Sequence, residues 1–83
     1  DVVLGFGAHP DPAAEIVPVI EKAQTAARRR RRSIAFVGFV CGTELDPQGL
    51  ERQEKALRAA GMILAGSNAE AVRLAASIAV KRR

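Results

Sequence analysis

Two stretches of the sequence combine glycine with side chains that could bind an anion or move a proton. The first, GFGAHPDPAAE at residues 5–15, contains Gly5, Gly7 and the single histidine, His9. A glycine-bearing loop that leads into a helix can offer backbone N–H groups to an anion. The same residue types also suit a tight turn that requires small residues or positive φ. Both interpretations are retained for this stretch.

His9 is a candidate for proton transfer or for carrying a phosphoryl group, because the unperturbed pKa of histidine lies near physiological pH. The carboxylate that the sequence places beside it is Asp11, two residues further on. Catalysis by His9 is therefore one of two alternatives. The other is a partly exposed loop histidine that shapes the turn.

The second stretch, CGTELDPQG at residues 41–49, follows the longest apolar block of the chain. Thr43 and Glu44 are its candidates for polar contacts with a ligand. Cys41 is predicted to be a small buried apolar residue, since no histidine base is near it in sequence. As the single cysteine it cannot form an intramolecular disulfide, which fits a reducing cytoplasm. No metal-ligand spacing occurs in the sequence.

Three apolar blocks, at residues 2–4 with Phe6, 33–40 and 62–65, must position these stretches. They are short and continuous, which is typical of strands buried on both faces of a parallel sheet. Helices are expected to begin at Asp11-Pro12, at Asp46-Pro47 and, with a capping box, at Ser67. Pro18 is expected either to kink the first helix or to move its start later.

Apolar spacing predicts which side of each helix faces the sheet. The second helix is expected to end at Gly61, a residue type that favours the position after a helix. The predicted inward residues are Ala13, Ile16, Ile20, Ala23 and Ala27 in the first helix, Leu50, Leu57 and Ala60 in the second, and Val72, Ala75, Ala76 and Ala79 in the third.

The order β-α-β-α-β-α predicts an α/β fold with a parallel sheet in three layers. Every loop that follows a strand would then lie at the carboxyl edge of the sheet, where open α/β folds bind ligands. The helix N-termini at that edge favour anions. The candidate phosphate- or anion-binding residues are Gly5, Gly7, Ala8, His9, Asp11, Gly42, Thr43, Ser67 and Asn68.

The formal net charge of +4 comes from two short basic clusters, at residues 28–32 and 81–83. Without their eight residues, 13 − 8 = 5 basic residues remain against nine acidic ones. Both clusters follow helices, so they are expected at the edge opposite the loops. A solvated basic loop is favoured over a nucleic-acid-binding module, because the chain lacks Tyr and Trp for base stacking. No apolar stretch approaches the roughly 20 residues of a membrane span.

Three segments, GFGAHPDPAAE, VCGTELDPQGLERQ and AGSNAEAVRLAA, resemble the C-terminal part of FdrA-type proteins. These belong to the acyl-CoA synthetase (succinyl-CoA synthetase-like) superfamily, and the resemblance covers essentially the whole chain. The layout is also similar to the ligase-CoA domain, which implies a partial flavodoxin-like fold.

In that family a glycine-rich loop and a helix N-terminus help to hold a phosphorylated histidine. The resemblance assigns this role to Gly5 and Gly7, with the helix near Asp11, and a second loop to Gly42 and Thr43. Phe6 separates the two glycines here, and Glu44 replaces the family's Asn. The phosphohistidine itself belongs to a different segment, so His9 does not inherit that role.

The resemblance implies that residues 1–83 are one C-terminal ligase-CoA-like domain of a longer, cytoplasmic protein. The domain would form one wall of a phosphoryl or acyl-phosphate site. The parent would be an acid–CoA ligase that uses ATP with Mg²⁺ and CoA, none of them bound by this chain, which alone is expected to be inactive. The alternative parent is a carbamoyltransferase of purine (oxalurate) degradation. The open sheet edge is expected to be covered by the rest of the chain, another subunit or a second copy.

Overall fold

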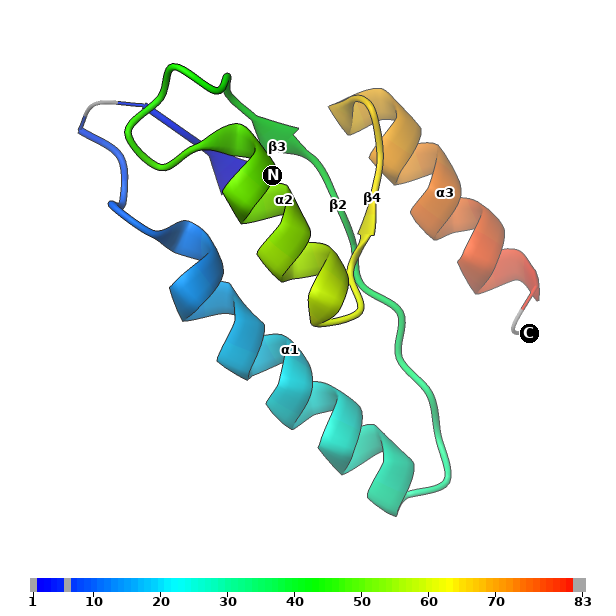
Figure 1. Cartoon of the computed structure of the whole chain (residues 1–83). Helices are drawn as coiled ribbons and strands as arrows, with labels where there is room; N and C mark the ends of the chain where they lie inside the picture. Colours follow the sequence, from blue (N-terminus) through cyan, green and yellow to red (C-terminus); the bar gives the residue numbers. More distant parts are fainter. Residues whose placement is uncertain (1, 6, 82–83) are drawn as a thin grey trace.

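Short parallel strands form the centre of the computed structural model, which describes residues 2–5 and 7–81 (Figure 1). One pair joins Val2 to Val40, and the other joins Val37 to Ile63. The backbone N–H of Ile63 donates to the carbonyl of Phe36, which extends the second ladder by one bond. The strands are β1 (Val2–Val3), β2 (Val37–Gly38), β3 (Val40–Cys41) and β4 (Ile63–Leu64).

The middle apolar block makes two ladders instead of the single strand predicted over residues 33–40. Its later part, β3, pairs with β1, and its earlier part, β2, pairs with β4. A strand is defined by its neighbours, so only the stretches that face another strand form a ladder. Residues 33–36 approach β2 without joining a strand. Phe6, predicted to continue the first strand, lies outside the described residues.

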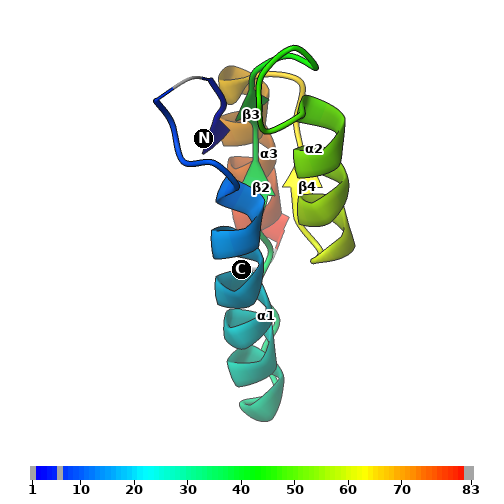
Figure 2. The same ribbon diagram turned by 60° about the vertical axis from the view of Figure 1, so that its left-hand side comes forward.

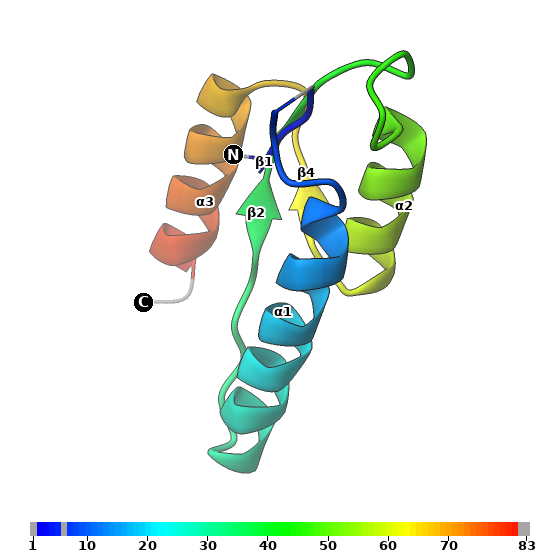
Figure 3. The ribbon, with the colours of Figure 1, turned by 90° about the vertical axis from the view of Figure 1, so that its left-hand side faces the viewer.

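The helices form the two outer layers, as predicted. Helices α1 (Pro12–Arg29) and α2 (Leu50–Ala59) lie on one face of the strands, and α3 (Asn68–Lys81) lies on the other (Figures 2 and 3). Helix α1 connects β1 to the segment that forms β2 and β3, and α2 connects that segment to β4. Two such crossovers of the same hand, one after the other, place both helices on the same face of the strands. Helix α3 packs against β2 from the opposite side.

The apolar core lies between the strands and the α1–α2 layer. Leu57 is fully buried, and Ile20 is 1% exposed. Burying a side chain of this size contributes about 1.5–3 kcal/mol relative to leaving it in water. The buried members of the core are Val2, Leu4, Ala13, Ile20, Val40, Leu57 and Ala60.

Helix α1 begins where the sequence predicts it. Asp11 is its N-cap, and Pro12 occupies the first helical position, where a missing N–H costs nothing. Pro18 lies inside the helix without ending it, so the later start considered for this helix is wrong. Proline removes the N–H that would bond to the carbonyl of Ala14, and both residues are exposed, so water can reach that carbonyl.

Helix α2 begins three residues later than predicted, with Leu50 rather than Pro47 as its first residue. Its N-cap is Gly49, at φ 75°, and no side chain caps the helix from that position. Asp46 turns back and accepts the N–H of Thr43 at 2.7 Å, so it is not the N-cap. The C-terminal prediction is confirmed, since Gly61 follows the helix at φ 103°.

The buried side of α3 differs from the predicted stripe. Ala71 is buried and Leu74 and Ile78 are half-buried, whereas the predicted residues Val72, Ala75, Ala76 and Ala79 are exposed. Ala71, Leu74 and Ile78 also follow helical spacing. Because apolar residues occupy most positions of this helix, its sequence does not distinguish one face from another.

Candidate functional site

The three loops that follow β1, β3 and β4 lie at one edge of the strands, the upper edge in Figure 1. This common edge follows from the parallel pairing, because parallel strands end in the same direction. The predicted gathering of these loops is therefore confirmed. The first two loops contact each other directly through side chains of residues 48–53, as described below.

Gln48 joins the loop after β1 to the loop after β3. Its side-chain oxygen accepts the N–H of Gly5 at 3.1 Å. Its amide nitrogen donates to the carbonyls of Gly5 and His9, each at 2.9 Å. The residue is 2% exposed, so these bonds are largely shielded from water. The sequence analysis missed Gln48, because nothing in its neighbourhood marks it as buried.

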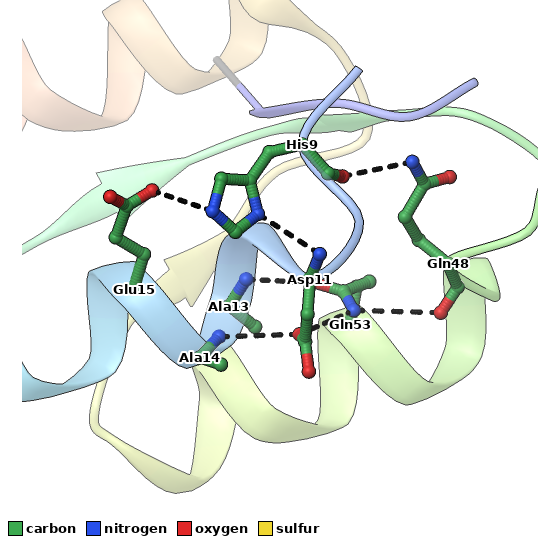
Figure 4. A network of polar contacts seen from close by, with 7 residues as sticks. All are labelled: His9, Asp11, Ala13, Ala14, Glu15, Gln48 and Gln53. Carbon is green, nitrogen blue, oxygen red and sulfur yellow. Dashed lines mark hydrogen bonds and ion pairs between the residues drawn. The ribbon is translucent and has the colours of Figure 1, made fainter. Parts of the chain in front are cut away.

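Gln53 makes a second connection, between α2 and the start of α1 (Figure 4). Its oxygen accepts the N–H of Ala13 at 2.8 Å, and its nitrogen donates to the Asp11 carboxylate at 2.9 Å. Gln53 is 1% exposed. A signal for it was present, since it is a polar residue on the inward stripe that contains Leu50 and Leu57.

The N-terminus of α1 is satisfied by groups of the chain itself. Asp11 accepts the N–H of Ala14 at 3.3 Å, while Ala13 donates to Gln53 and Pro12 has no N–H. The hydrogen bond from the Gln53 amide, and then that from the Ala14 N–H, lower the pKa of Asp11 below its ordinary value of 3.8. The first-turn donors of this helix are thus engaged by an internal carboxylate and an internal amide.

His9 is held within the turn by both ring nitrogens (Figure 4). Nδ1 accepts the backbone N–H of Asp11 at 3.0 Å, and Nε2 lies 3.1 Å from a Glu15 carboxylate oxygen. A nitrogen that accepts an N–H carries no proton, so this network assigns the ring proton to Nε2. This arrangement matches the turn-shaping alternative, with Glu15 as a partner that the sequence analysis did not name.

The glycines of the two loops meet different structural needs. Gly5 and Gly7 have φ of 145° and 88°, values that L side chains rarely adopt. A Cβ at Gly42 would lie 2.7 Å from the Cβ of Leu4, so this glycine allows close packing. The turn interpretation accounts for Gly5 and Gly7, and close packing accounts for Gly42. Within the described residues, no hydrogen bond engages the N–H of Gly7.

Helix α3 is also capped by its own residues. Ser67 Oγ accepts the N–H of Glu70 at 3.1 Å, as the capping box predicts. The Glu70 carboxylate accepts the N–H of Gly66 at 3.3 Å. Asn68 begins the helix.

Helix α2 differs from α1 and α3, since its N-cap is a glycine without a side-chain cap. The carboxylate of Glu44, five residues before the N-cap, accepts the N–H of Glu51 in the first turn. Thr43 and Asp46 shape the loop that carries Glu44, since Thr43 Oγ1 accepts the N–H of Leu45 at 3.2 Å. The N-terminus of α2 is therefore contacted by a carboxylate oxygen from the loop that leads into this helix.

Carboxylates dominate the charge of the loop edge. A cation is also present, since Arg52 lies in the first turn of α2, but its guanidinium donates to the carbonyl of Gln48, from Nε at 3.0 Å and from Nη2 at 2.9 Å. Carboxylate repulsion disfavours a ligand with several negative charges spread along the edge. The acidic residues of the loops and first helical turns are Asp11, Glu15, Glu44, Asp46, Glu51 and Glu70.

Cys41 does not behave as predicted, because its side chain is exposed at the end of β3. In a parallel sheet its burial depends on a covering layer, and the described chain provides none at this position. Across residues 2–5 and 7–81, no helix combines the length and apolar content that a membrane span requires.

A family model described as CoA-ligase matches residues 1–78 of the chain. The chain is also similar to the uncharacterized protein YahF of Escherichia coli (strain K12), with 41% identity over 68 residues. That match covers 82% of this chain and 13% of the relative, so the chain corresponds to a small part of that protein.

Proposed function

The chain belongs to the CoA-ligase family, and we propose that it forms one wall of a phosphoryl or acyl-phosphate site in a larger CoA-ligase-like protein. The proposed wall is the loop at residues 42–49 together with the N-terminus of α2. The observation that supports it is the carboxylate of Glu44 on the N–H of Glu51. Helix N-terminal N–H groups that donate to an anionic oxygen of the chain are also suited to donate to an anionic oxygen of a ligand.

The proposal assigns different roles to the residues of this wall. Thr43 and Asp46 hold the loop, while the first-turn N–H groups of α2 stabilise negative charge on a phosphoryl oxygen. Glu44 leaves this position when the ligand binds, because two anions compete for the same donors. Gly7, whose N–H has no hydrogen bond within the described chain, lies in the neighbouring loop at the same edge.

The loop edge carries several carboxylates, which disfavour the multiply charged phosphates of CoA and ATP. We therefore assign them to other parts of the larger protein and derive no step through them. The FdrA-type assignment, and with it the carbamoyltransferase alternative, is a finer proposal within the family. Acetyl phosphate and carbamoyl phosphate share the phosphoryl group and differ in the acyl part, so a binding test can separate the two.

The test is a nuclear magnetic resonance titration of the 83-residue chain with inorganic phosphate, acetyl phosphate and carbamoyl phosphate. We expect amide shift changes over residues 43–52. Glu44→Gln keeps a hydrogen-bond acceptor but removes the charge, and Glu44→Ala removes both. Affinity is expected to rise in the order wild type, Glu44→Gln, Glu44→Ala, by about twofold to fivefold in total.

Glu21→Gln is the matched control, because it removes an exposed carboxylate from α1, away from this loop. It is expected to bind phosphate as the wild type does. Equal gains for the Glu21 and Glu44 variants would mean that overall charge alone governs binding. Either that result or an absence of shifts over residues 43–52 would overturn the proposed wall.

A further inference from the structure

The end of the molecule opposite the loops carries five consecutive arginines, at residues 28–32 (Figure 1). All five are exposed, and no carboxylate of the described residues forms an ion pair with them. Arg28 donates to Thr25 Oγ1 at 3.4 Å. Arg31 adopts φ 55°, so the chain reverses within the run. Five neighbouring cations without anionic partners favour binding of an acidic group from outside the chain.

Apolar grooves border the same end of the molecule. One, of about 470 Å³, lies between α3 and the segment at residues 33–37, with Ile34, Phe36 and Ile78 among its lining residues. A second, of about 370 Å³, lies beside the end of α1 and includes Arg30 and Arg32. Both grooves include Ser33 and Ile34, so apolar and cationic surfaces are continuous around this segment.

Part of the backbone of this segment, at Ile34 and Ala35, lies beyond the β2–β4 ladder. The β2–β4 ladder reaches its end with the bond from Ile63 to Phe36, and within the described residues no backbone hydrogen bond reaches Ile34 or Ala35. Ile34 is 43% exposed. An extended segment with free N–H and C=O groups can receive another strand, with side chains placed in pockets on alternate sides.

We propose that residues 28–37 and the adjoining face of α3 form a docking surface for an acidic polypeptide segment that carries apolar side chains. The carboxylates of the segment pair with the arginines, its apolar side chains fill the two grooves, and its backbone pairs beside Ile34 and Ala35. This surface is separate from the loop edge, so the inference does not depend on the proposed phosphoryl site.

Charge and shape favour this occupant over three others. A second copy would bring an identical arginine run against the first in a two-fold interface, which is repulsive. A nucleic acid would satisfy the arginines but would leave the apolar grooves unfilled. A membrane surface is a poor fit to recessed grooves, since lipid contact favours protruding apolar side chains.

The test is titration of the 83-residue chain with a synthetic peptide of alternating Glu and Leu. Amide shifts are expected at residues 30–37 and 75–79, with affinity that falls as salt is added. A matched peptide of alternating Glu and Ser keeps the charge but cannot fill the grooves. It is expected to bind about tenfold more weakly, as is the double variant Arg30→Gln/Arg32→Gln with the Glu-Leu peptide.

Arg58→Gln is the control variant, since Arg58 is an exposed arginine on α2. It is expected to leave peptide affinity unchanged, and circular dichroism checks that each variant is folded. Equal affinity for the two peptides would overturn the proposal. So would tighter binding of an RNA oligonucleotide or of vesicles with anionic lipid than of the Glu-Leu peptide, or shifts confined to other residues.

Discussion

The two ends of this molecule treat their polar groups in opposite ways. At the loop edge, Gln48, Gln53 and Asp11 engage backbone groups of neighbouring loops and helix starts. At the opposite end, the arginines at 28–32 lack ion-pair partners among the described residues. One end is organised by internal hydrogen bonds, whereas the other presents charge and apolar grooves to the surroundings.

This difference follows from the burial of the polar groups at each end. Buried amides must find hydrogen-bond partners, because an unsatisfied buried group costs about 1–3 kcal/mol. Exposed arginines have no such requirement, since water solvates them. The loop edge is therefore expected to depend on single buried residues, and the arginine end to tolerate substitution without loss of stability.

The largest expected effect is at Gln48. Gln48→Ala removes the partner of the Gly5 N–H and two donated bonds, and is expected to lower the free energy of unfolding by about 1–3 kcal/mol. Urea denaturation measures the change. Gln24→Ala is the matched control, since Gln24 is a half-buried glutamine near the other end of α1. Its expected cost is below about 0.5 kcal/mol, and equal costs for the two variants would remove the contrast between the ends.

A smaller effect on the free energy of unfolding is expected from the titration of Asp11. Its pKa is lower in the folded chain than the ordinary value of 3.8, so the folded state binds the proton less well than the unfolded state. The stabilisation is complete above that ordinary value and is lost as pH falls through the folded pKa. Asp11→Asn is expected to lose this pH dependence, as measured by urea denaturation over a series of acidic pH values.

Gln53→Ala tests which hydrogen bond causes the pH dependence that Asp11 gives to the free energy of unfolding. Because the Gln53 amide is the leading cause of the lowered pKa, this variant is expected to retain Asp11 but show a reduced pH dependence. A wild-type dependence in Gln53→Ala would mean that the cap at Ala14 governs the titration instead.

The smallest expected effect is at the arginine end. Arg30→Gln/Arg32→Gln is expected to change the free energy of unfolding by less than about 0.5 kcal/mol, with relief of repulsion offsetting lost helix-terminus interactions. Thermal and urea denaturation measure it. A larger destabilisation would show that the run stabilises the fold, in contrast to its exposed and unpaired state.

Much of the fold was predictable from local patterns. Asp11-Pro12 marked the start of α1, Gly61 marked the end of α2, and the apolar blocks located the strands. These signals act over a few residues, through capping bonds, backbone conformation and burial. Asp46-Pro47 was a misleading signal, because Asp46 bonds backward to Thr43 and leaves Gly49 to begin α2.

The gathering of the loops was predictable, but the contacts that they make were not. Parallel β-α order is enough to bring the loops to one edge, whichever side chains they carry. The partners of Gly5, His9 and Asp11 were not predictable, since Gln48 and Gln53 lie about 40 residues away in sequence. The exposure of Cys41 was likewise missed, because burial at a strand end depends on which element covers it.

The sequence by itself determined the order of elements, the helix caps at Asp11 and Ser67 and the separation of the arginines at 28–32 from the loops. These depend on interactions within one or two turns of chain, or on the direction in which parallel strands run. Only the tertiary structure decided which N–H groups remain available and which face of α3 is buried. Such outcomes depend on contacts between distant segments, where each buried polar group takes the partner that packing brings within reach.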